Sequence, residues 1–264
     1  NRFMKFDKLL DFAFAHGLNY IVTGHYARIE RDENTGRYLL KKGVDEGKDQ
    51  SYVLYNLTQH QLAHTIFPLG AYSKTQIREM AEQQGFCNAR KHDSQDICFV
   101  PDGDYVGFME QYTGKRYPSG DFIDESGKKI GTHAGAVRYT IGQRRGLGLP
   151  MGDRVYVCAK DMEKNTVTVG PVESLFATRV IVRDMNWISV PELTGEMRVK
   201  AKLRYRQKEQ PAVASPLDGG RILLTFDEPQ RGPAIGQAAV LYDGDTVVGG
   251  GTICGVPKDG EVCR

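Results

Sequence analysis

The stretch Tyr20-Ile-Val-Thr-Gly24 decides the fold of the first part of this chain. It predicts a short buried strand that ends at a glycine, and the apolar spacing over residues 2–16 predicts a helix directly before it. A helix, a strand and a glycine turn in this order are typical of an open α/β sheet. Ligands of such sheets bind at the carboxyl ends of the strands. We therefore expect a ligand-binding edge at Thr23, Gly24 and His25.

Two residues of this edge, Gly24 and His25, also have a structural explanation. Gly24 could serve only to turn the chain, and a histidine such as His25 is as often structural as it is a ligand. The next segments are ordinary elements: a hairpin over residues 26–42, and a helix that begins near Lys48-Asp-Gln-Ser51 with Asp49 or Ser51 as its cap. Further along, Ser73 and Gln76 form a capping-box pattern, which predicts a helix that ends at Gly85.

Cys98 is a candidate nucleophile within the stretch Lys91–Pro101, which reads KHDSQDICFVP. It lies in a short apolar run, which predicts a strand over Asp96–Val100, directly after a polar and charged turn. A thiol at the mouth of a strand beside groups that move protons can act as a nucleophile. The alternative is core packing, because cysteine is among the most buried residue types. Neighbouring aspartates disfavour the thiolate and Lys91 favours it, so its ionisation stays open.

The composition is that of an ordinary globular chain of 264 residues, with 40% hydrophobic residues and a net charge of +2. Any nucleic-acid binding must therefore come from local basic patches. No apolar run approaches the ~18 residues that cross a bilayer, and we expect a cytoplasmic protein without a membrane partner. The five cysteines are widely spaced and predict neither a disulfide framework nor a metal site. Because the chain opens at Asn1 inside a helical pattern, we expect it to be a fragment.

The middle of the chain changes character from Asp102. A short helix over about 104–112 is followed by glycine- and lysine-rich turns and by Thr140–Pro150, an exposed basic loop with three glycines and two adjacent arginines. This loop matches neither the P-loop spacing nor the dinucleotide fingerprint. Residues 155–170 predict a hairpin that closes a small middle unit.

The last third predicts short strands with glycine and proline turns, which favours a small closed barrel. The expected strands are Arg179–Val182, Glu196–Gln207, Arg221–Phe226, Ala238–Tyr242 and Thr246–Val248, with a hairpin turn at Asp243-Gly244. Basic residues occupy every second position from Arg198 to Lys208, which on a strand puts all six on one face. This stripe is either a surface for a polyanion or a solvated edge strand made basic against aggregation.

Six segments, in this order, together resemble the bacterial tRNA-specific 2-thiouridylases of the MnmA type. They are Asn1-Arg-Phe-Met-Lys-Phe6, Thr23-Gly-His-Tyr26, Lys48-Asp-Gln-Ser-Tyr52, Asp93-Ser-Gln-Asp-Ile-Cys-Phe99, Thr140-Ile-Gly-Gln-Arg-Arg-Gly-Leu-Gly148 and Leu203-Arg-Tyr-Arg-Gln207. The resemblance implies α/β plus all-β architecture in three parts. These are the C-terminal half of an N-type ATP-pyrophosphatase (adenine nucleotide α hydrolase-like) domain over 1–103, a bridging domain over 104–172 and a tRNA-binding β-barrel over 173–264.

The resemblance also implies a sulfurtransferase activity. The family adenylates the wobble uridine of tRNA with ATP and Mg²⁺, and a cysteine persulfide then supplies sulfur to give 2-thiouridine. Cys98 matches the persulfide carrier. In family members, a second cysteine acts as the nucleophile and then forms a disulfide with the first. This second cysteine lies immediately before the residue that matches Asn1, and the family's ATP loop lies further upstream. We therefore expect this fragment alone to be inactive. The implied partners are the tRNAs for Lys, Glu and Gln and a persulfide donor such as a cysteine desulfurase or a sulfur-relay protein.

Further site residues follow from the matching positions. Gly24 matches an ATP-binding glycine, and His25 a site residue beside it, near nucleotide and tRNA. The positions that match tRNA contacts are Lys48, Asp49, Gln50, Arg204, Tyr205 and Gln237. Two other interpretations stay open: a non-catalytic RNA-binding module with a structural Cys98, and a thiol-dependent redox enzyme with a Cys87–Cys98 disulfide.

Overall fold

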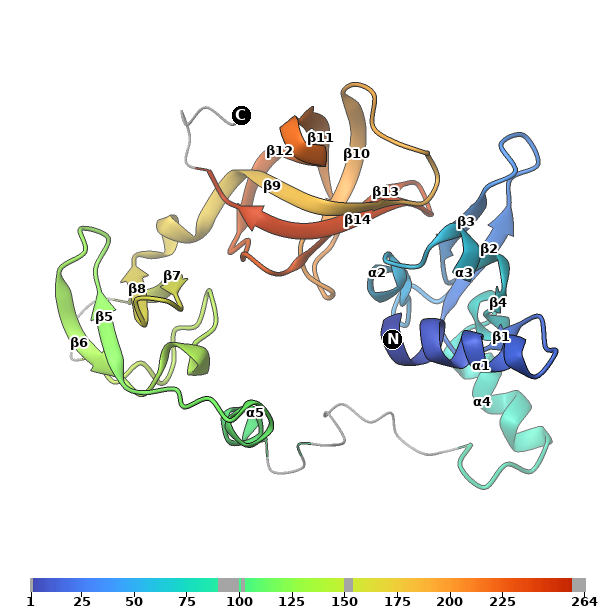
Figure 1. Cartoon of the computed structure of the whole chain (residues 1–264), viewed down its shortest axis with the longest axis horizontal. Coiled ribbons are helices and arrows are strands. Elements are labelled where there is room, and N and C mark those ends of the chain that lie inside the picture. Colours follow the sequence, from blue (N-terminus) through green and yellow to red (C-terminus); the bar gives the residue numbers. More distant parts are fainter. Residues whose placement is uncertain (1, 90–99, 101–102, 150–153, 258–264) are drawn as a thin grey trace. The chain divides into compact units, whose positions relative to one another are not determined.

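A computed structural model describes residues 2–89, 100, 103–149 and 154–257 (Figure 1). Cys98 and almost all of the strand expected over 96–100 lie outside these residues, so both stay predictions. The chain divides into two compact units. The first comprises Asn1–Arg90, Thr178–Glu228 and Ile235–Arg264, and the second comprises Lys91–Ala177 and Pro229–Ala234.

The first unit begins with the expected helix and strand. A π-helical segment, η1 (Arg2–Lys8), continues into α1 (Leu9–Ala15), and this helix buries Phe6, Leu10 and Ala13. Strand β1 (Ile21–Val22) pairs in parallel with β4 (Thr65–Ile66), as an open α/β sheet requires. The expected strand is shorter than its sequence pattern, and only its first residue is buried, because Val22 is 63% exposed.

The expected hairpin and the helices expected near Ser51 and after Ser73 are confirmed, whereas the short helices α3 (Gln59–Ala63) and η2 (Pro68–Ala71) were not predicted. Strands β2 (Ala27–Arg31) and β3 (Tyr38–Lys42) form the antiparallel hairpin, followed by the short helices α2 (Ser51–Leu54), α3 and η2. Helix α4 (Lys74–Gln83) begins at the predicted capping box, in which the side chains of Ser73 and Gln76 each accept from the other's backbone N–H. Gly85 follows it with a φ of +72°, a left-handed conformation that favours glycine.

The C-terminal part is a closed barrel, as predicted, but it has six strands where the sequence predicted five. The six strands are β9 (Phe176–Trp187), β10 (Met197–Lys202), β11 (Gln210–Leu217), β12 (Arg221–Arg231), β13 (Ala238–Asp243) and β14 (Thr246–Gly255). They pair in the order β13-β10-β11-β12-β9-β14, and β13 pairs with β14 to close the barrel. Strand β11 was not expected, because Pro211 and Pro216 disfavour a strand in sequence alone.

The barrel and the α/β part share hydrophobic packing. One cluster fills the barrel with residues such as Val199, Leu224 and Leu241. A second cluster joins Phe6 of the helical part to Tyr242 on β13. In addition, Lys41 on β3 pairs with Thr246 on β14, which extends the barrel sheet by the β2–β3 hairpin. The expected first and third domains are therefore packed in one compact unit, while their boundaries at 103 and 173 stay predictions.

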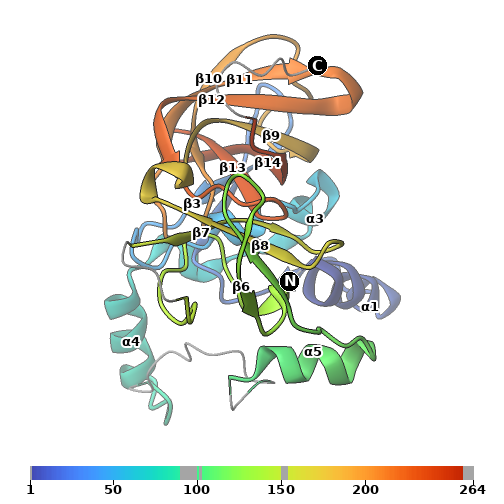
Figure 2. The same cartoon turned by 90° about the vertical axis from the view of Figure 1, so that its left-hand side faces the viewer.

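In its described residues, the second unit consists of helix α5 (Tyr105–Thr113), two short 3-10 helices and a four-stranded sheet (Figure 2). Helix α5 begins after Asp104, whose side chain accepts from Gly107 N. The sheet has the order β6 (Lys129–His133), β5 (Gly120–Ile123), β8 (Thr166–Gly170), β7 (Tyr156–Asp161), and its core includes Phe122 and Val167. The hairpin expected over 155–170 is confirmed as β7–β8. The short helices η3 (Ala136–Arg138) and η4 (Val172–Leu175) complete the unit.

Candidate functional site

The carboxyl end of β1 presents Thr23, Gly24 and His25, as the sequence predicted. Thr23 N donates to Ile66 O on the parallel strand (3.1 Å), and the Thr23 hydroxyl lies 2.7 Å from His25 Nδ1. The imidazole is buried, with its ring 5.7 Å from that of Phe6 and 5.5 Å from that of Phe67. Burial, with a smaller effect of Lys5, lowers the pKa of His25 to about 4. At neutral pH this histidine is therefore an uncharged side chain in a fixed orientation.

Gly24 does not need to be glycine for the backbone to turn. Its φ lies outside the left-handed range, and an added Cβ would lie 3.4 Å from Leu69 Cδ1, an ordinary contact. Gly70 is different, because a Cβ there would lie 1.8 Å from Ala27 O. The fold therefore requires a glycine at 70, where η2 approaches β2, but not at 24. Turning the chain is not a sufficient reason for Gly24.

Gln50 attaches the next predicted segment directly to this edge. Its backbone N donates to Tyr26 O and its side-chain Oε1 accepts from Tyr26 N, and both donor–acceptor distances are 2.9 Å. Because Tyr26 follows His25 in the chain, residues 48–50 lie beside the carboxyl end of β1. The Gln50 side chain thus holds the backbone together at this place.

Asp49 organises the start of α2. Its Oδ1 accepts from the backbone N of Gly43 and of Ser51, each over 3.1 Å, and its Oδ2 accepts from the Ser51 hydroxyl (2.8 Å). The fully buried Ser51 hydroxyl also lies 3.3 Å from Tyr242 OH on β13, and burial strongly raises the pKa of that phenol. The N-cap position of α2 is Gln50, so the prediction that Asp49 or Ser51 is the cap was wrong. The Asp49 carboxylate instead holds the start of the helix through hydrogen bonds within the protein.

Tyr205 joins the barrel to the same segment. Its hydroxyl donates to Asp49 O (3.2 Å), and its ring centroid lies 5.9 Å from that of Tyr52. Tyr52 OH in turn donates to the carbonyl of Ala238 (3.0 Å), the residue after the exposed Gln237. The sequence-predicted segments 48–50 and 204–205 therefore meet at two tyrosine rings, and Gln237 precedes the residue that Tyr52 contacts. We call this the tyrosine surface: Lys48, Tyr52, Lys202, Arg204, Tyr205 and Gln237.

Positive side chains surround these rings. Lys202 Nζ lies 5.8 Å from the centroid of the Tyr52 ring, and the charges of Lys48 and Arg206 each act to lower the pKa of Tyr205. Burial and the nearby Asp49 act in the opposite sense and prevail, so the pKa of Tyr205 is raised. The phenol stays protonated at neutral pH and can donate its hydrogen bond. Tyr205 is 42% exposed, so part of its ring is open beside cations.

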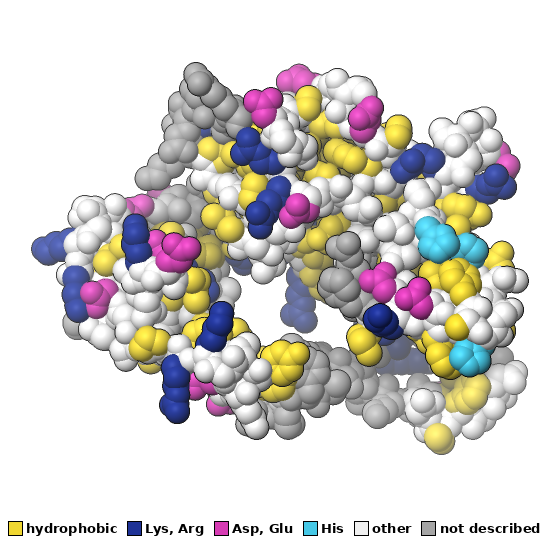
Figure 3. Space-filling view, viewed as in Figure 1, with side chains coloured by type: hydrophobic (Ala, Val, Ile, Leu, Met, Phe, Trp, Pro, Cys, Tyr) yellow, Lys and Arg dark blue, Asp and Glu magenta, His cyan; other side chains and the backbone are white. Residues whose placement is uncertain are grey.

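The prediction that six basic residues from Arg198 to Lys208 lie on one strand face was wrong. Strand β10 ends at Lys202, and residues 203–207 form a turn in which Leu203 N donates to Gln207 Oε1 (3.2 Å) and Gln207 N to Arg204 O (3.1 Å). At the other end Arg198 forms a two-pronged ion pair with Asp227 of β12. On the face shown in Figure 3, positive and negative side chains accordingly lie side by side over the barrel. The positive residues after Lys202 are presented by a turn.

None of the described cysteines is among the residues of this site. Cys87 is exposed, and burial raises the pKa of Cys158 to about 11, which makes that thiol a poor nucleophile at neutral pH. Within residues 2–89, 103–149 and 154–257, no group of three His, Cys, Asp or Glu side chains is arranged to hold a metal ion. No helix in the same ranges is long and apolar enough to cross a membrane.

Comparisons with known proteins place the fold in a class. Three family models match successive parts of the chain: the tRNA methyl transferase HUP domain over 1–102, the tRNA methyl transferase PRC-barrel domain over 106–171 and the Aminomethyltransferase beta-barrel domain over 177–253. A HUP domain followed by a PRC-barrel and a β-barrel is the three-part architecture that the sequence resemblance implied. The class is thus that of HUP-domain enzymes named for tRNA modification.

Curated relatives narrow this class to a family. The chain is 50% identical over 253 residues to the tRNA-specific 2-thiouridylase MnmA 1 of Thermoanaerobacter sp. (strain X514), which is 96% of this chain and 70% of the relative. It is 51% identical to MnmA of Moorella thermoacetica and 47% to MnmA of Clostridioides difficile, again over 96% of this chain and 71% and 70% of those proteins. The chain belongs to the MnmA family of tRNA-specific 2-thiouridylases.

Proposed function

We propose that this protein is a tRNA 2-thiouridylase, an ATP-dependent sulfurtransferase that converts the wobble uridine of tRNA to 2-thiouridine. One observation carries the proposal in structural terms. The tyrosine surface brings 48–50, 204–205 and 237 together beside Gly24 and His25. A nucleic acid bound to this surface lies next to the edge at which a nucleotide would bind.

The tyrosine surface has the chemistry of a single-stranded RNA site. Lys48, Lys202 and Arg204 supply positive charge for backbone phosphates, which position an RNA without reading its sequence. The open part of the Tyr205 ring can stack on an unpaired base, and anticodon bases are available for such stacking. Asp49 and Gln50 act differently, because their side chains are occupied by Ser51 and Tyr26. They hold the surface in shape, and Lys48 adds a positive charge beside Tyr205.

The Thr23-Gly24-His25 edge fits the adenine nucleotide that the reaction consumes. A glycine whose Cβ the fold could accept leaves backbone open to a ligand, and the uncharged His25 is held by Thr23 and two aromatic rings. The described residues therefore supply one wall of the ATP site, and the reaction also uses Mg²⁺. ATP supplies the activation of the uridine O2 by adenylation, with pyrophosphate as the leaving group.

Cys98 is proposed as the persulfide carrier. Its outer sulfur attacks C2 of the activated uridine, and AMP leaves with the former O2. A second thiolate then attacks the Cys98 sulfur, so that a disulfide forms and the outer sulfur stays on the base. The substrates are the tRNAs for Lys, Glu and Gln, the sulfur comes from a cysteine desulfurase or a sulfur-relay protein, and the reaction takes place in the cytoplasm.

The proposal is tested by thiolation of tRNA with the natural full-length protein, ATP and a persulfide donor, read by mass spectrometry of the nucleosides. We expect 2-thiouridine from the wild type and from Cys87→Ser, and none from Cys98→Ser. Cys87 is a matched control because it is the neighbouring exposed thiol. Binding of tRNA without any thiolation would support the RNA-binding module, and a Cys87–Cys98 disulfide in the native protein would support the redox enzyme.

A further inference from the structure

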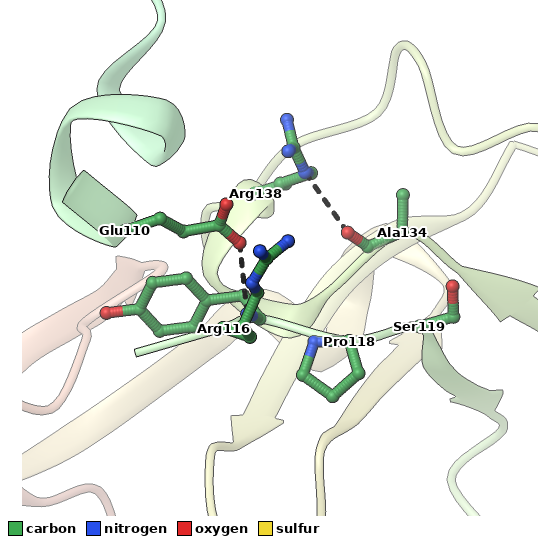
Figure 4. A pocket seen from close by; sticks show the side chains of 7 residues that line it. Glu110, Arg116, Pro118, Ser119, Ala134 and Arg138 are labelled. Atoms are coloured by element: carbon green, nitrogen blue, oxygen red, sulfur yellow. Dashed lines mark hydrogen bonds between the residues drawn. The ribbon is translucent and has the colours of Figure 1, made fainter. Parts of the chain in front are cut away.

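The second unit contains a pocket that none of the residues discussed so far as site residues lines (Figure 4). Its volume is about 440 Å³. It lies where the segment after α5 passes η3, and its lining residues are Glu110, Arg116, Tyr117, Pro118, Ser119, Ala134 and Arg138. Two arginines and a serine, all three exposed, thus line one open pocket.

The walls of the pocket are held together by hydrogen bonds and close backbone packing. Asn165 Nδ2 donates to the carbonyls of Pro118 and Ser119, each over 3.0 Å, and its Oδ1 accepts from Ala136 N (3.2 Å). Gly135 has a φ of +109°, and a Cβ there would lie 2.8 Å from Tyr117 O, so the two walls approach as closely as the backbone allows. The segment 117–119 and the start of η3 are therefore fixed to each other before any ligand binds.

The side chains add a net positive charge. Arg138 Nε donates to Ala134 O (3.1 Å), which leaves its two terminal nitrogens directed away from that bond (Figure 4). Glu110 Oε1 accepts from Tyr117 N (3.1 Å), and this bond connects α5 to the segment 117–119. The lining residues include two guanidinium groups and one carboxylate, which gives the pocket lining a net charge of one positive unit.

We propose that this pocket binds a phosphodiester group of the RNA substrate. A phosphodiester carries one negative charge, which matches the excess charge of the pocket, and guanidinium groups with a hydroxyl donor are suited to phosphate oxygens. A pre-formed wall reduces the ordering that binding would otherwise require. The proposal rests on the proposed function, because it assigns this pocket a second contact with the same tRNA.

The test is the salt dependence of tRNA binding by the natural full-length protein, measured by fluorescence anisotropy. The variants are Arg116→Gln and Arg138→Gln, each alone and combined, and Lys115→Gln is the control. Lys115→Gln removes one positive charge, as each single variant does, from the adjacent residue outside the pocket lining. Each phosphate contact contributes ~0.7–0.9 to the slope of log K against log salt. We expect the double variant to reduce the slope by about one unit and the affinity about tenfold, and K115Q to change neither. Thermal unfolding confirms that all the variants fold.

Each outcome supports or overturns the proposal. An unchanged slope in the double variant, or an equal reduction in K115Q, overturns it. Inorganic phosphate that binds the wild type by calorimetry without reducing tRNA affinity shows a site for the free anion, which also overturns it. If the wild type binds no tRNA, the proposed function itself fails. If the wild type binds and thiolates tRNA and the double variant behaves identically, the proposed function stands and only the phosphate site in the pocket is overturned.

Discussion

The hydroxyl of Tyr205 donates a hydrogen bond to the backbone carbonyl of Asp49 over 3.2 Å, across 156 positions of the chain. This bond connects the turn after β10 to the segment before α2. It places an aromatic ring from the barrel beside the lysine that precedes Asp49. The tyrosine surface therefore exists only when the barrel and the α/β part are packed as they are here.

The ring and the hydroxyl of Tyr205 have separable roles. Tyr205→Phe removes one partly exposed hydrogen bond and should lower the free energy of unfolding by about 0.5–1.5 kcal/mol while it keeps the ring. Tyr205→Ala also removes the stacking surface and should weaken tRNA binding by about 1–3 kcal/mol. Urea unfolding and anisotropy with tRNA measure the two effects. Equal tRNA affinities for the two variants would contradict a stacking role.

The turn after β10, and not the strand itself, should carry the salt dependence of tRNA binding. Arg204→Ala with Arg206→Ala should reduce the slope of log K against log salt by ~0.7–0.9 for each phosphate that the variant no longer binds. Arg198→Ala is the matched control, because that arginine is already paired with Asp227. A change for Arg198→Ala as large as that for the double variant would restore the strand-face interpretation.

The buried hydroxyl of Ser51 should be important for stability. Ser51→Ala leaves Asp49 Oδ2 and Tyr242 OH without this partner, at a cost of about 1–3 kcal/mol. Tyr242→Phe removes the other side of the contact, so the double variant should cost less than the sum of the two single ones. Urea unfolding of the three variants gives this coupling energy. Strict additivity would show that the 3.3 Å contact contributes nothing.

Substitution by alanine should have different effects at Gly24 and at Gly70. Gly24→Ala should leave the unfolding temperature nearly unchanged but weaken ATP binding, because the new methyl fits the fold and occupies the open backbone edge. Gly70→Ala should be strongly destabilising, because its Cβ would collide with Ala27 O. Differential scanning fluorimetry with and without ATP measures both. Unchanged ATP affinity in the folded G24A variant would remove Gly24 from the nucleotide site.

Burial of His25 makes stability depend on pH. Its pKa is lowered from 6.5 to about 4, so between these values the unfolded chain binds a proton that the folded chain does not. The stabilisation is complete above pH 6.5 and decreases as the pH falls toward 4, by at most about 1.4 kcal/mol per pH unit. Unfolding free energies near neutral pH and at mildly acidic pH, for the wild type and His25→Gln, measure this decrease. An identical pH slope in both proteins would show that His25 is not buried in its neutral form.

Local patterns in the sequence were sufficient for much of the secondary structure. The capping box at Ser73, the hairpin turns and the alternation of the barrel strands depend on neighbours a few residues apart, so they can be seen in the sequence alone. The family, too, followed from short segments whose order and spacing are recorded in the chain. Most of the residues expected at the site were predicted by matching the same segments to the family.

Only the tertiary structure decided what those residues do together. Asp49 and Gln50 have their side chains bound to Ser51 and Tyr26, while Tyr205 reaches the same segment from the barrel. The basic alternation from Arg198 predicted one long face, but Leu203 is buried and the chain turns there. A periodic pattern records which way side chains point if a strand continues, whereas the end of the strand depends on packing with distant residues. Ion pairs such as that between Arg198 and Asp227, which change the charge of a surface, are decided in the same way.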